Sequence, residues 1–282
     1  MLTVSEDEEP ELFWGIRGAG PNFGVVTSFE FELHELGPVV TQGFVDFPAE
    51  RGHEIAARVR EYLASAPDEV MVSFGVSTRT EEDGVDLVGR PVVRVGATHS
   101  GSPDDAVDVL RPLRDLRPIA DTFRQVPYLE LQTSADEDMA WGKRFYMKGA
   151  FLAELSDAFV DAAVEHASTP RGAVTLWAQG GAISRLPGDA MAFTGREAAF
   201  WIGVEAEWDD AAEDEALIDW GRSTMAAFEP FTAAGHYVND VIETGRDVVR
   251  SVYGDTKYER LVGLKRTFDP DNVFRLNQNI EP

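Results

Sequence analysis

The sequence predicts an α+β fold, in which a large antiparallel sheet is covered by helices on one face. Two observations indicate this class. Segments that alternate apolar with polar residues, as half-buried strands do, recur along the chain with amphipathic helical segments between them. Hydrophobic residues also make up 44% of the 282 residues, which is enough for a buried core and argues against disorder.

The chain opens with a helix, a glycine-rich loop and a strand. Residues 11–17 are expected to form a short helix, because Pro10 suits a first helical turn and Gly18 ends the pattern. Three glycines then fall within residues 18–24. Residues 25–33 alternate after them, with Phe and Leu on one side and acidic residues on the other, which predicts a half-buried strand.

A Gly37-Pro38 pair marks a break and a domain boundary. Strands are expected after it at residues 39–47, 70–77, 91–99, 118–125, 144–151, 172–179 and 198–207. Helices are expected at residues 50–66, 103–115, 156–166, 210–229, 241–253 and 258–268. The helix at 50–66, for example, has Ile55, Val59 and Tyr62 on one face.

The chain is strongly acidic, with 50 Asp and Glu against 25 Lys and Arg and a net charge of −25. Such a charge repels nucleic acid and anionic lipid, so neither partner is expected. Only four of the basic residues are lysines, and the acidic residues are spread along the chain. This pattern suits a cytoplasm of very high salt, where charge repulsion is screened, and we predict a halophilic source.

Cysteine is absent, which excludes a disulfide, a thiolate nucleophile and a cysteinyl metal site within these residues. The five histidines are far apart in sequence, so no metal site is expected. No apolar run approaches the ~20 residues that a membrane helix needs. The first ten residues are acidic and lack the basic start of a signal peptide, which predicts a cytoplasmic protein.

Three segments carry candidate binding residues. The glycines of residues 18–24 let a backbone approach a ligand closely, although the same loop could be a tight helix-to-strand turn. Residues 235–240 gather a histidine, a phenol, an amide and a carboxylate, which is typical of a site loop and equally of a capped helix start. Asn277 and Asn279 would face the same way on an extended tail.

A fourth candidate lies on the predicted sheet. Tyr146 and Lys148 share one face of their strand, and Trp177 and Gln179 share a face of another. A sheet face that bears a phenol, an ammonium group, an indole and an amide is a credible substrate floor. The alternative is that these residues are half-buried at a polar edge of the sheet.

Several stretches together resemble the FAD-linked oxidases of the berberine bridge enzyme type. They are "LFWGIRGAGPNFGVVTSFEFELHELGP", "VPYLELQT", "GGAISRLPGDAMAFTGREAAF", "YVND" and "YERLVGLKRTFDPDNVFRLNQNI", in that order. The resemblance implies the remnant of a bipartite FAD-binding domain at residues 1–38, an inserted α+β substrate domain at 39–236 and a return segment at 237–282. It also implies that a further N-terminal FAD-binding portion is missing from this sequence.

The same resemblance implies roles for particular residues. Gly18, Gly20, Asn22, Gly24 and Val26 would be neighbours of the flavin nucleotide; Tyr237, Asn239, Asn277 and Asn279 would lie near the flavin ring; Tyr146, Lys148 and Gln179 would line the substrate cavity. The family often has Y-x-N-Y where this chain has Tyr237-Val238-Asn239-Asp240. The catalytic base is therefore either Asp240, if burial raises its pKa, or Tyr237.

Two functions of different classes remain open at this point. The first is an FAD-dependent oxidoreductase, or its C-terminal part, that oxidises an alcohol, a sugar or an amine by hydride transfer to flavin. The second is a non-catalytic fragment or binding module without a complete FAD site. Because the strand at residues 25–33 would expose apolar surface, we also expect either self-association or an N-terminal FAD-binding partner chain.

Overall fold

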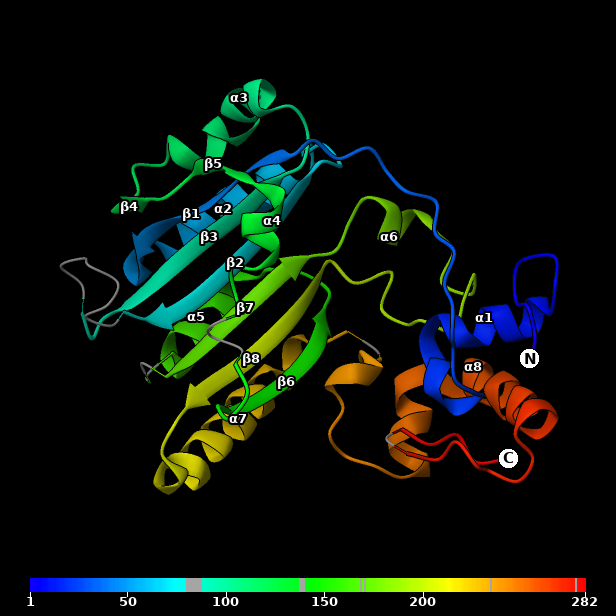
Figure 1. The fold of residues 1–282 in the computed structure, drawn as a ribbon. Coiled ribbons are helices and arrows are strands. Elements are labelled where there is room, and N and C mark those ends of the chain that lie inside the picture. Colours follow the sequence, from blue (N-terminus) through cyan, green and yellow to red (C-terminus); the bar gives the residue numbers. More distant parts are fainter. Residues whose placement is uncertain (80–87, 137–139, 168, 170, 234, 277) are drawn as a thin grey trace.

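The computed structural model describes residues 1–79, 88–136, 140–167, 169, 171–233, 235–276 and 278–282. These residues form an eight-stranded antiparallel sheet (Figure 1), in the order β4-β1-β3-β2-β7-β8-β6, with β5 also paired to β1. The strands are β1 (Val39–Pro48), β2 (Val70–Thr78), β3 (Pro91–His99), β4 (Ala120–Asp121), β5 (Arg124–Pro127), β6 (Arg144–Leu152), β7 (Gly172–Ala178) and β8 (Phe200–Trp208). The predicted α+β class is confirmed.

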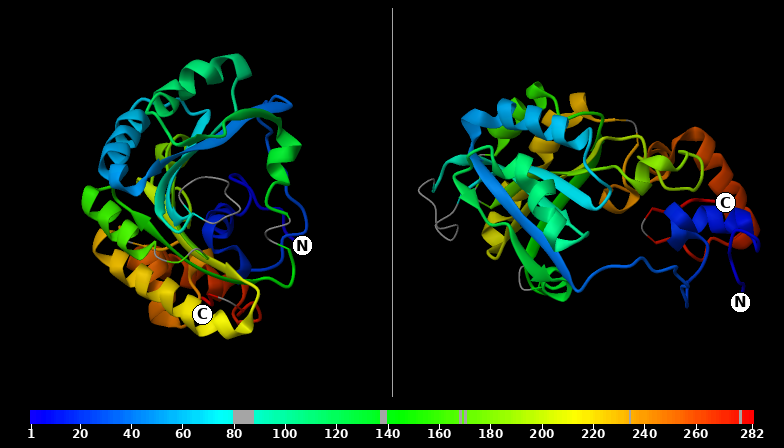
Figure 2. Two further views of the ribbon diagram at one scale, coloured as in Figure 1. Left: turned by 90° about the vertical axis from the view of Figure 1, so that its left-hand side faces the viewer. Right: turned by 90° about the horizontal axis from the view of Figure 1, so that it is seen from above.

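Helices cover one face of this sheet, and Figure 2 shows them on its outer side. They are α2 (Gly52–Leu63), α3 (Pro103–Arg114), α5 (Asp157–His166) and α7 (Asp214–Phe228). Ser102 and Ser156 cap α3 and α5 by accepting hydrogen bonds from backbone N–H groups of the first turn. Short helices α4 (Tyr128–Gln132) and α6 (Ala182–Arg185) follow β5 and β7.

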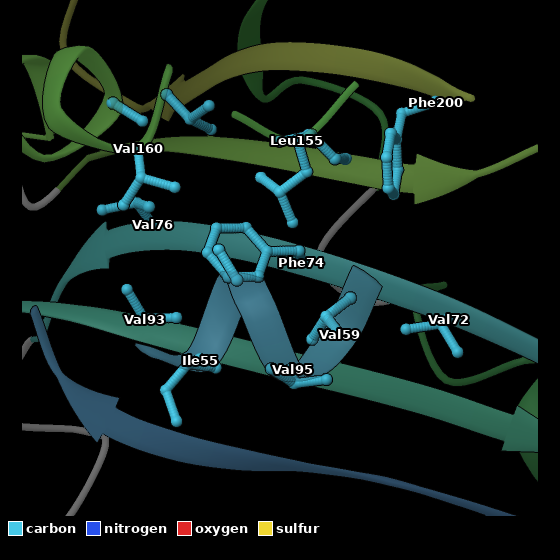
Figure 3. Packing of buried hydrophobic residues seen from close by; sticks show 14 of the residues in the cluster. Ile55, Val59, Val72, Phe74, Val76, Val93, Val95, Leu155, Val160 and Phe200 are labelled. Carbon is cyan, nitrogen blue, oxygen red and sulfur yellow. The ribbon is translucent and has the colours of Figure 1, made fainter. Parts of the chain in front are cut away.

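The main core lies between the helices and the sheet (Figure 3). Alternate residues of each strand enter it, so that Phe74, Val95 and Leu176 are fully buried against Ile55 and Val59 of α2. Each such side chain contributes about 1.5–3 kcal/mol through burial. The intervening residues of the same strands point to the opposite face of the sheet, which we call the second face.

A separate core lies at one end of the molecule, where α1 (Pro10–Ala19) packs beside α8 (Arg246–Phe268). Both termini are found at this end in Figures 1 and 2. The buried residues there include Leu12, Trp14, Leu261 and Ile280. Residues from the two ends of the chain therefore share one hydrophobic cluster.

One local prediction is wrong, and another needs its boundary corrected. Residues 25–33 do not form a strand: they make no backbone hydrogen bond to another described segment, and Phe29, Phe31 and Leu33 are exposed. Alternation indicates strand propensity, but a strand also needs a partner for its backbone groups. The helices expected at 241–253 and 258–268 correspond to the two parts of α8, which are separated by a kink at the non-helical Gly254, where φ is 71°. The first part begins at Arg246 rather than at residue 241.

The described residues contain neither a membrane-spanning helix nor a metal-binding cluster. None of their helices is long and apolar enough to cross a bilayer. Nor do they contain a group of three or more His, Cys, Asp or Glu side chains arranged to hold a metal ion.

Candidate functional site

A cavity of about 960 Å³ lies beside the end cluster, and three separate parts of the chain line it. These are residues 16–22, which include the glycine-rich loop, the segment from Ile183 to Arg196, and residues 237–244 around the short helix η6 (Val238–Asp240). Gln278, from the C-terminal tail, completes the wall. The cavity thus combines the glycine-rich loop, the predicted site loop and the tail.

Asn22 joins the glycine-rich loop to the tail. Its buried side chain donates a hydrogen bond to Gln278 O (3.2 Å) and accepts one from the backbone N–H of Ile280 (2.8 Å). An amide side chain can donate and accept at the same time, and here it bonds to the backbone of the tail in both ways. It fixes the position of Gln278 in the cavity wall.

Lys265 also joins the glycine-rich loop to the C-terminal tail. The ammonium group is fully buried and donates to Asn22 O (2.9 Å), Phe274 O (2.6 Å) and the Asp269 carboxylate (2.6 Å). Asp269 in turn accepts hydrogen bonds from the backbone N–H groups of Val273 and Phe274. Every donor of the buried ammonium group is therefore satisfied, as a buried charge requires.

Gly18 is required by protein packing rather than by a ligand. Its φ is 146°, and a Cβ on it would lie 2.1 Å from the backbone N of Phe193. The loop before β8 reaches back to this point, because Ala192 and Phe193 donate to the carbonyls of Trp14 and Arg17. By contrast, a Cβ on Gly20 would meet nothing within 4 Å, so its backbone faces open space in the cavity.

The cavity presents both cationic and amide groups. Arg17 and Arg196 line it, and Arg196 is nine-tenths buried with no partner for its Nε–H. Gln278 donates through Nε2 to Val241 O, but its buried Oε1 accepts no hydrogen bond from the part of the chain that the structure describes. An Arg suits an anionic group, and an unpaired amide oxygen suits a ring N–H, so a ligand that carries both fits these residues.

Not all predicted cofactor residues reach the cavity. Gly18, Gly20, Asn22, Tyr237 and Asn239 line it. Gly24 and Val26 are outside the lining, and Val26 is exposed. Asn279 is also outside, although its Oδ1 is buried without a partner, and Asn277 falls outside the described residues.

Residues 237–240 connect the cavity to the second face of the sheet. Tyr237 and Asn239 face the cavity, where Asn239 Nδ2 donates to the Tyr237 hydroxyl at 2.7 Å. Asp240 points the other way: its carboxylate lies over Gly149 of β6 and accepts a hydrogen bond from Trp201 Nε1. Burial raises the pKa of Asp240, and the hydrogen bond from Trp201 opposes this only in part.

Glu205 is a second carboxyl on this face, half-buried, that the sequence did not single out. Burial raises the pKa of Glu205, and the nearby charge of Asp240 raises it further. Alternation could have placed Glu205 on one face with Trp201 and Gly203, because the three residues occupy alternate positions of β8. Without the register between strands, nothing distinguished these residues from ordinary sheet surface.

The predicted substrate residues do not come together. Tyr146 lies on the helix-covered face, packed against Trp208 and Leu217. Lys148 is on the same side of β6, and its ammonium group pairs with Glu243 at 2.6 Å. Gln179 follows β7, two residues after Trp177 of the second face. Tyr146 is therefore separated by the sheet from Asp240 and Glu205.

Replacing Glu205 with Gln is expected to stabilise the protein at high pH. The pKa of Glu205 is higher in the folded state than in the unfolded state, so the ionised carboxylate destabilises the fold above the unfolded pKa of about 4.3. The gain in melting temperature should be absent at acidic pH and grow as pH rises through the folded pKa. Glu207→Gln, which removes the partner of Lys143, should show no such gain.

This chain is similar to known proteins both in sequence and in fold. Residues 236–281 match the family model "Berberine and berberine like". The whole chain is 33% identical to (R)-6-hydroxynicotine oxidase of Paenarthrobacter nicotinovorans and spans 63% of that protein. The crystal structure of 6-hydroxy-D-nicotine oxidase from Arthrobacter nicotinovorans superposes on 99% of the chain with a TM-score of 0.78 and 29% identity, with 63% of that chain covered.

A second solved structure extends the likeness in fold. It is a berberine bridge enzyme-like protein from Physcomitrella patens, with a TM-score of 0.81 at 18% identity over 99% of this chain and 62% of that one. The chain therefore spans about three-fifths of the length of the proteins that it resembles.

Proposed function

We propose that this chain, which along its whole length is similar to the C-terminal part of FAD-linked oxidoreductases of the berberine bridge enzyme type, forms part of an FAD-dependent oxidoreductase. Its substrate would be an alcohol, a sugar or an amine. The observation that carries this proposal is the cavity in which Gly20 and Asn22, from the start of the chain, meet Tyr237, Asn239 and Gln278 from its end.

The groups in that cavity suit FAD. Its volume of about 960 Å³ is at the upper end of the usual range for small-molecule sites. Arg17 and Arg196 would face the anionic part of the cofactor, and the free Oε1 of Gln278 could accept a hydrogen bond from the flavin ring. A bound flavin would supply the acceptor for a hydride leaving the substrate.

The chain itself would supply the base. Asp240 lies directly beyond the cavity residues Tyr237 and Asn239, and Trp201 Nε1 holds its carboxylate in place. Its raised pKa brings it closer to neutral pH, which favours proton transfer from a substrate hydroxyl or ammonium group. Tyr237, whose hydroxyl is engaged by Asn239, is the alternative base.

The proposed function divides the chain into the same domains as the sequence predicts. Residues 1–38 and 237–282 would form the FAD-binding portion, and residues 39–236 the substrate domain. The separation of the two hydrophobic clusters supports this division. The loop around Ala192 lies within the substrate domain in sequence, but it packs in the hydrophobic cluster of the FAD-binding portion. It would therefore connect the substrate domain to the FAD-binding portion.

The proposal is tested by titrating the chain with FAD and following quenching of flavin fluorescence. Gly20→Ala should leave the fold unchanged, because a Cβ there meets no described protein atom within 4 Å, and it serves as the small-side-chain control. Gly20→Trp should abolish binding by filling the cavity. If the chain binds no FAD, alone or co-expressed with the N-terminal part of (R)-6-hydroxynicotine oxidase, the proposed function is wrong.

We further propose that residues 25–33 pair with another polypeptide, either an N-terminal FAD-binding portion or a second copy of the chain. Phe29 and Phe31 are exposed and stacked on each other, with ring centroids 5.6 Å apart. The segment therefore offers an apolar side together with unpaired backbone groups, which is the feature that promotes strand addition.

Light scattering should accordingly show association of the isolated chain, and Phe29→Ser with Phe31→Ser should reduce it strongly. Glu30→Gln with Glu32→Gln, on the other side of the same segment, should not reduce it. A clean monomer of the parent chain in high salt would contradict the expectation.

A halophilic source is proposed from the composition. With 50 acidic against 25 basic residues, carboxylates repel one another most strongly at low ionic strength. The melting temperature should therefore rise steadily between ~0.2 M and ~2 M KCl, as the screening length falls to a few ångströms. A melting temperature that is flat or falls over this range would argue for an ordinary acidic protein.

A further inference from the structure

Two glycines form a floor on the second face of the sheet. Gly149 of β6 and Gly203 of β8 are direct cross-strand partners. A Cβ on Gly203 would lie 2.8 Å from Glu205 Oε1, 3.2 Å from Trp177 and 3.4 Å from Trp201. One carboxylate oxygen and the benzo edges of two indoles therefore lie close together over a residue that has no side chain, where a Cβ would be tight against all three.

The two indoles form the wall of this space. Trp177 of β7 and Trp201 of β8 are register partners, and their ring centroids are 4.6 Å apart with an angle of 35° between the planes. Both side chains are only partly buried. Indole faces attract cations more strongly than other aromatic rings do, and the attraction grows as the site is shielded from water.

Among the described residues, neither the Asp240 nor the Glu205 carboxylate has a cationic partner. Asp240 is 7% exposed, and Trp201 donates a hydrogen bond to its Oδ2, which leaves Oδ1 without a donor among the described residues. Glu205 accepts no hydrogen bond and joins no ion pair within the same described set. The nearest ammonium group on β6, that of Lys148, is already paired with Glu243.

We propose that the substrate is an amine, whose ammonium group binds over Gly203 between the Glu205 carboxylate and the indoles of Trp177 and Trp201, with Asp240 completing the charge balance. This inference rests on the proposed function in taking the ligand to be the substrate. A neutral alcohol or sugar could stack on the indoles, but it would leave two partly buried carboxylates without a counter-charge.

The electrostatics agree with this geometry. Burial and the charge of Asp240 both raise the pKa of Glu205, so ionising both carboxyls together carries an electrostatic cost. A bound cation removes that penalty and gains the attraction of both carboxylates. The site is thus organised to prefer a positive ligand over a neutral ligand of equal shape.

The test compares benzylamine with benzyl alcohol, which have the same shape but differ in charge at pH 7. Binding to the full chain is followed by tryptophan fluorescence and calorimetry, with and without FAD. Benzylamine should bind at least tenfold more tightly than benzyl alcohol. Glu205→Gln should reduce this preference to threefold or less, and Trp177→Leu should weaken binding of both compounds.

Matched variants exclude indirect effects. Glu207→Gln, two residues along β8, should leave the preference for benzylamine intact, because Glu207 is paired with Lys143 away from the floor. Gly203→Ala should weaken benzylamine binding tenfold or more by filling the space. Thermal melting verifies that each variant is folded.

Equal binding of the two compounds, no binding of benzylamine under either condition, or an undiminished preference in a folded Glu205→Gln would each overturn the inference. These results are distinguishable from failure of the proposed function. A chain that prefers benzylamine yet never binds FAD would contradict the oxidoreductase proposal alone. A chain that binds FAD without preferring the amine would contradict the amine site alone.

Discussion

Lys265→Met is expected to lower the free energy of unfolding by about 3–5 kcal/mol, the usual cost of removing one partner from a buried ion pair. Methionine fills a similar volume, so the loss would come from polar groups rather than from a cavity. The buried Asp269 carboxylate would lose its counter-charge, and the carbonyls of Asn22 and Phe274 would each lose a donor. The glycine-rich loop and the tail would then separate more easily.

Denaturant unfolding followed by tryptophan fluorescence measures this effect, with attention to a separate transition of the end cluster that contains Trp14. Arg266→Met is the matched control, because Arg266 is the next residue of α8 and is exposed. Its effect should stay within about 0.5 kcal/mol. A loss below about 1 kcal/mol for Lys265→Met would mean that this residue does not hold the ends of the chain together.

Asp240→Asn is expected to slow substrate oxidation by about 10²–10⁴-fold, the usual contribution of a positioned base. Asn keeps the size of the side chain and can still accept from Trp201 Nε1, but it cannot take a proton. The rate of flavin reduction in a single anaerobic turnover of the FAD-loaded protein measures the step directly, without contributions from reoxidation.

Tyr237→Phe distinguishes the two candidate bases. Phe keeps the ring contact of Tyr237 with Phe193 but loses the hydroxyl that Asn239 contacts. Tyr237→Phe should therefore disturb the cavity wall and slow substrate oxidation less than Asp240→Asn does. The rate loss of Asp240→Asn should also be accompanied by loss of the acidic limb of the pH–rate profile. A larger loss in Tyr237→Phe, with little change in Asp240→Asn, would assign the base to the phenol.

Much of the sheet was predictable from sequence, because its strands alternate β-branched and aromatic residues with polar ones and sit between clear breaks. Phe74, Val93 and Val95 enter the core as their spacing predicts. The residue types of 235–240 also predicted a site loop there, and Tyr237 and Asn239 of this segment line the cavity. The pattern did not show that Asp240 would turn to the sheet, since that depends on Trp201, 39 residues away in sequence.

Other features depend on pairing that no single segment reveals. Residues 25–33 have the composition of a strand, yet the described chain offers them no partner. Alternation predicts that Asn277 and Asn279 share one side of the tail, and the resemblance implies that this side is near the flavin. Gln278 lines the cavity, with the tail held there by Asn22, while Asn277 lies outside the described residues. Tyr146 and Lys148 share one side of β6, as alternation predicts. That side is covered by α7, which no local pattern reveals.

Hydrogen exchange of the chain with and without FAD tests the central claim most directly. If the two ends of the chain form one flavin site, FAD should slow exchange at amides in residues 18–24, 237–242 and 278–280 together, and Gly20→Trp should remove all three effects. Protection of only one of these segments, or equal exchange with and without FAD, would contradict a shared site.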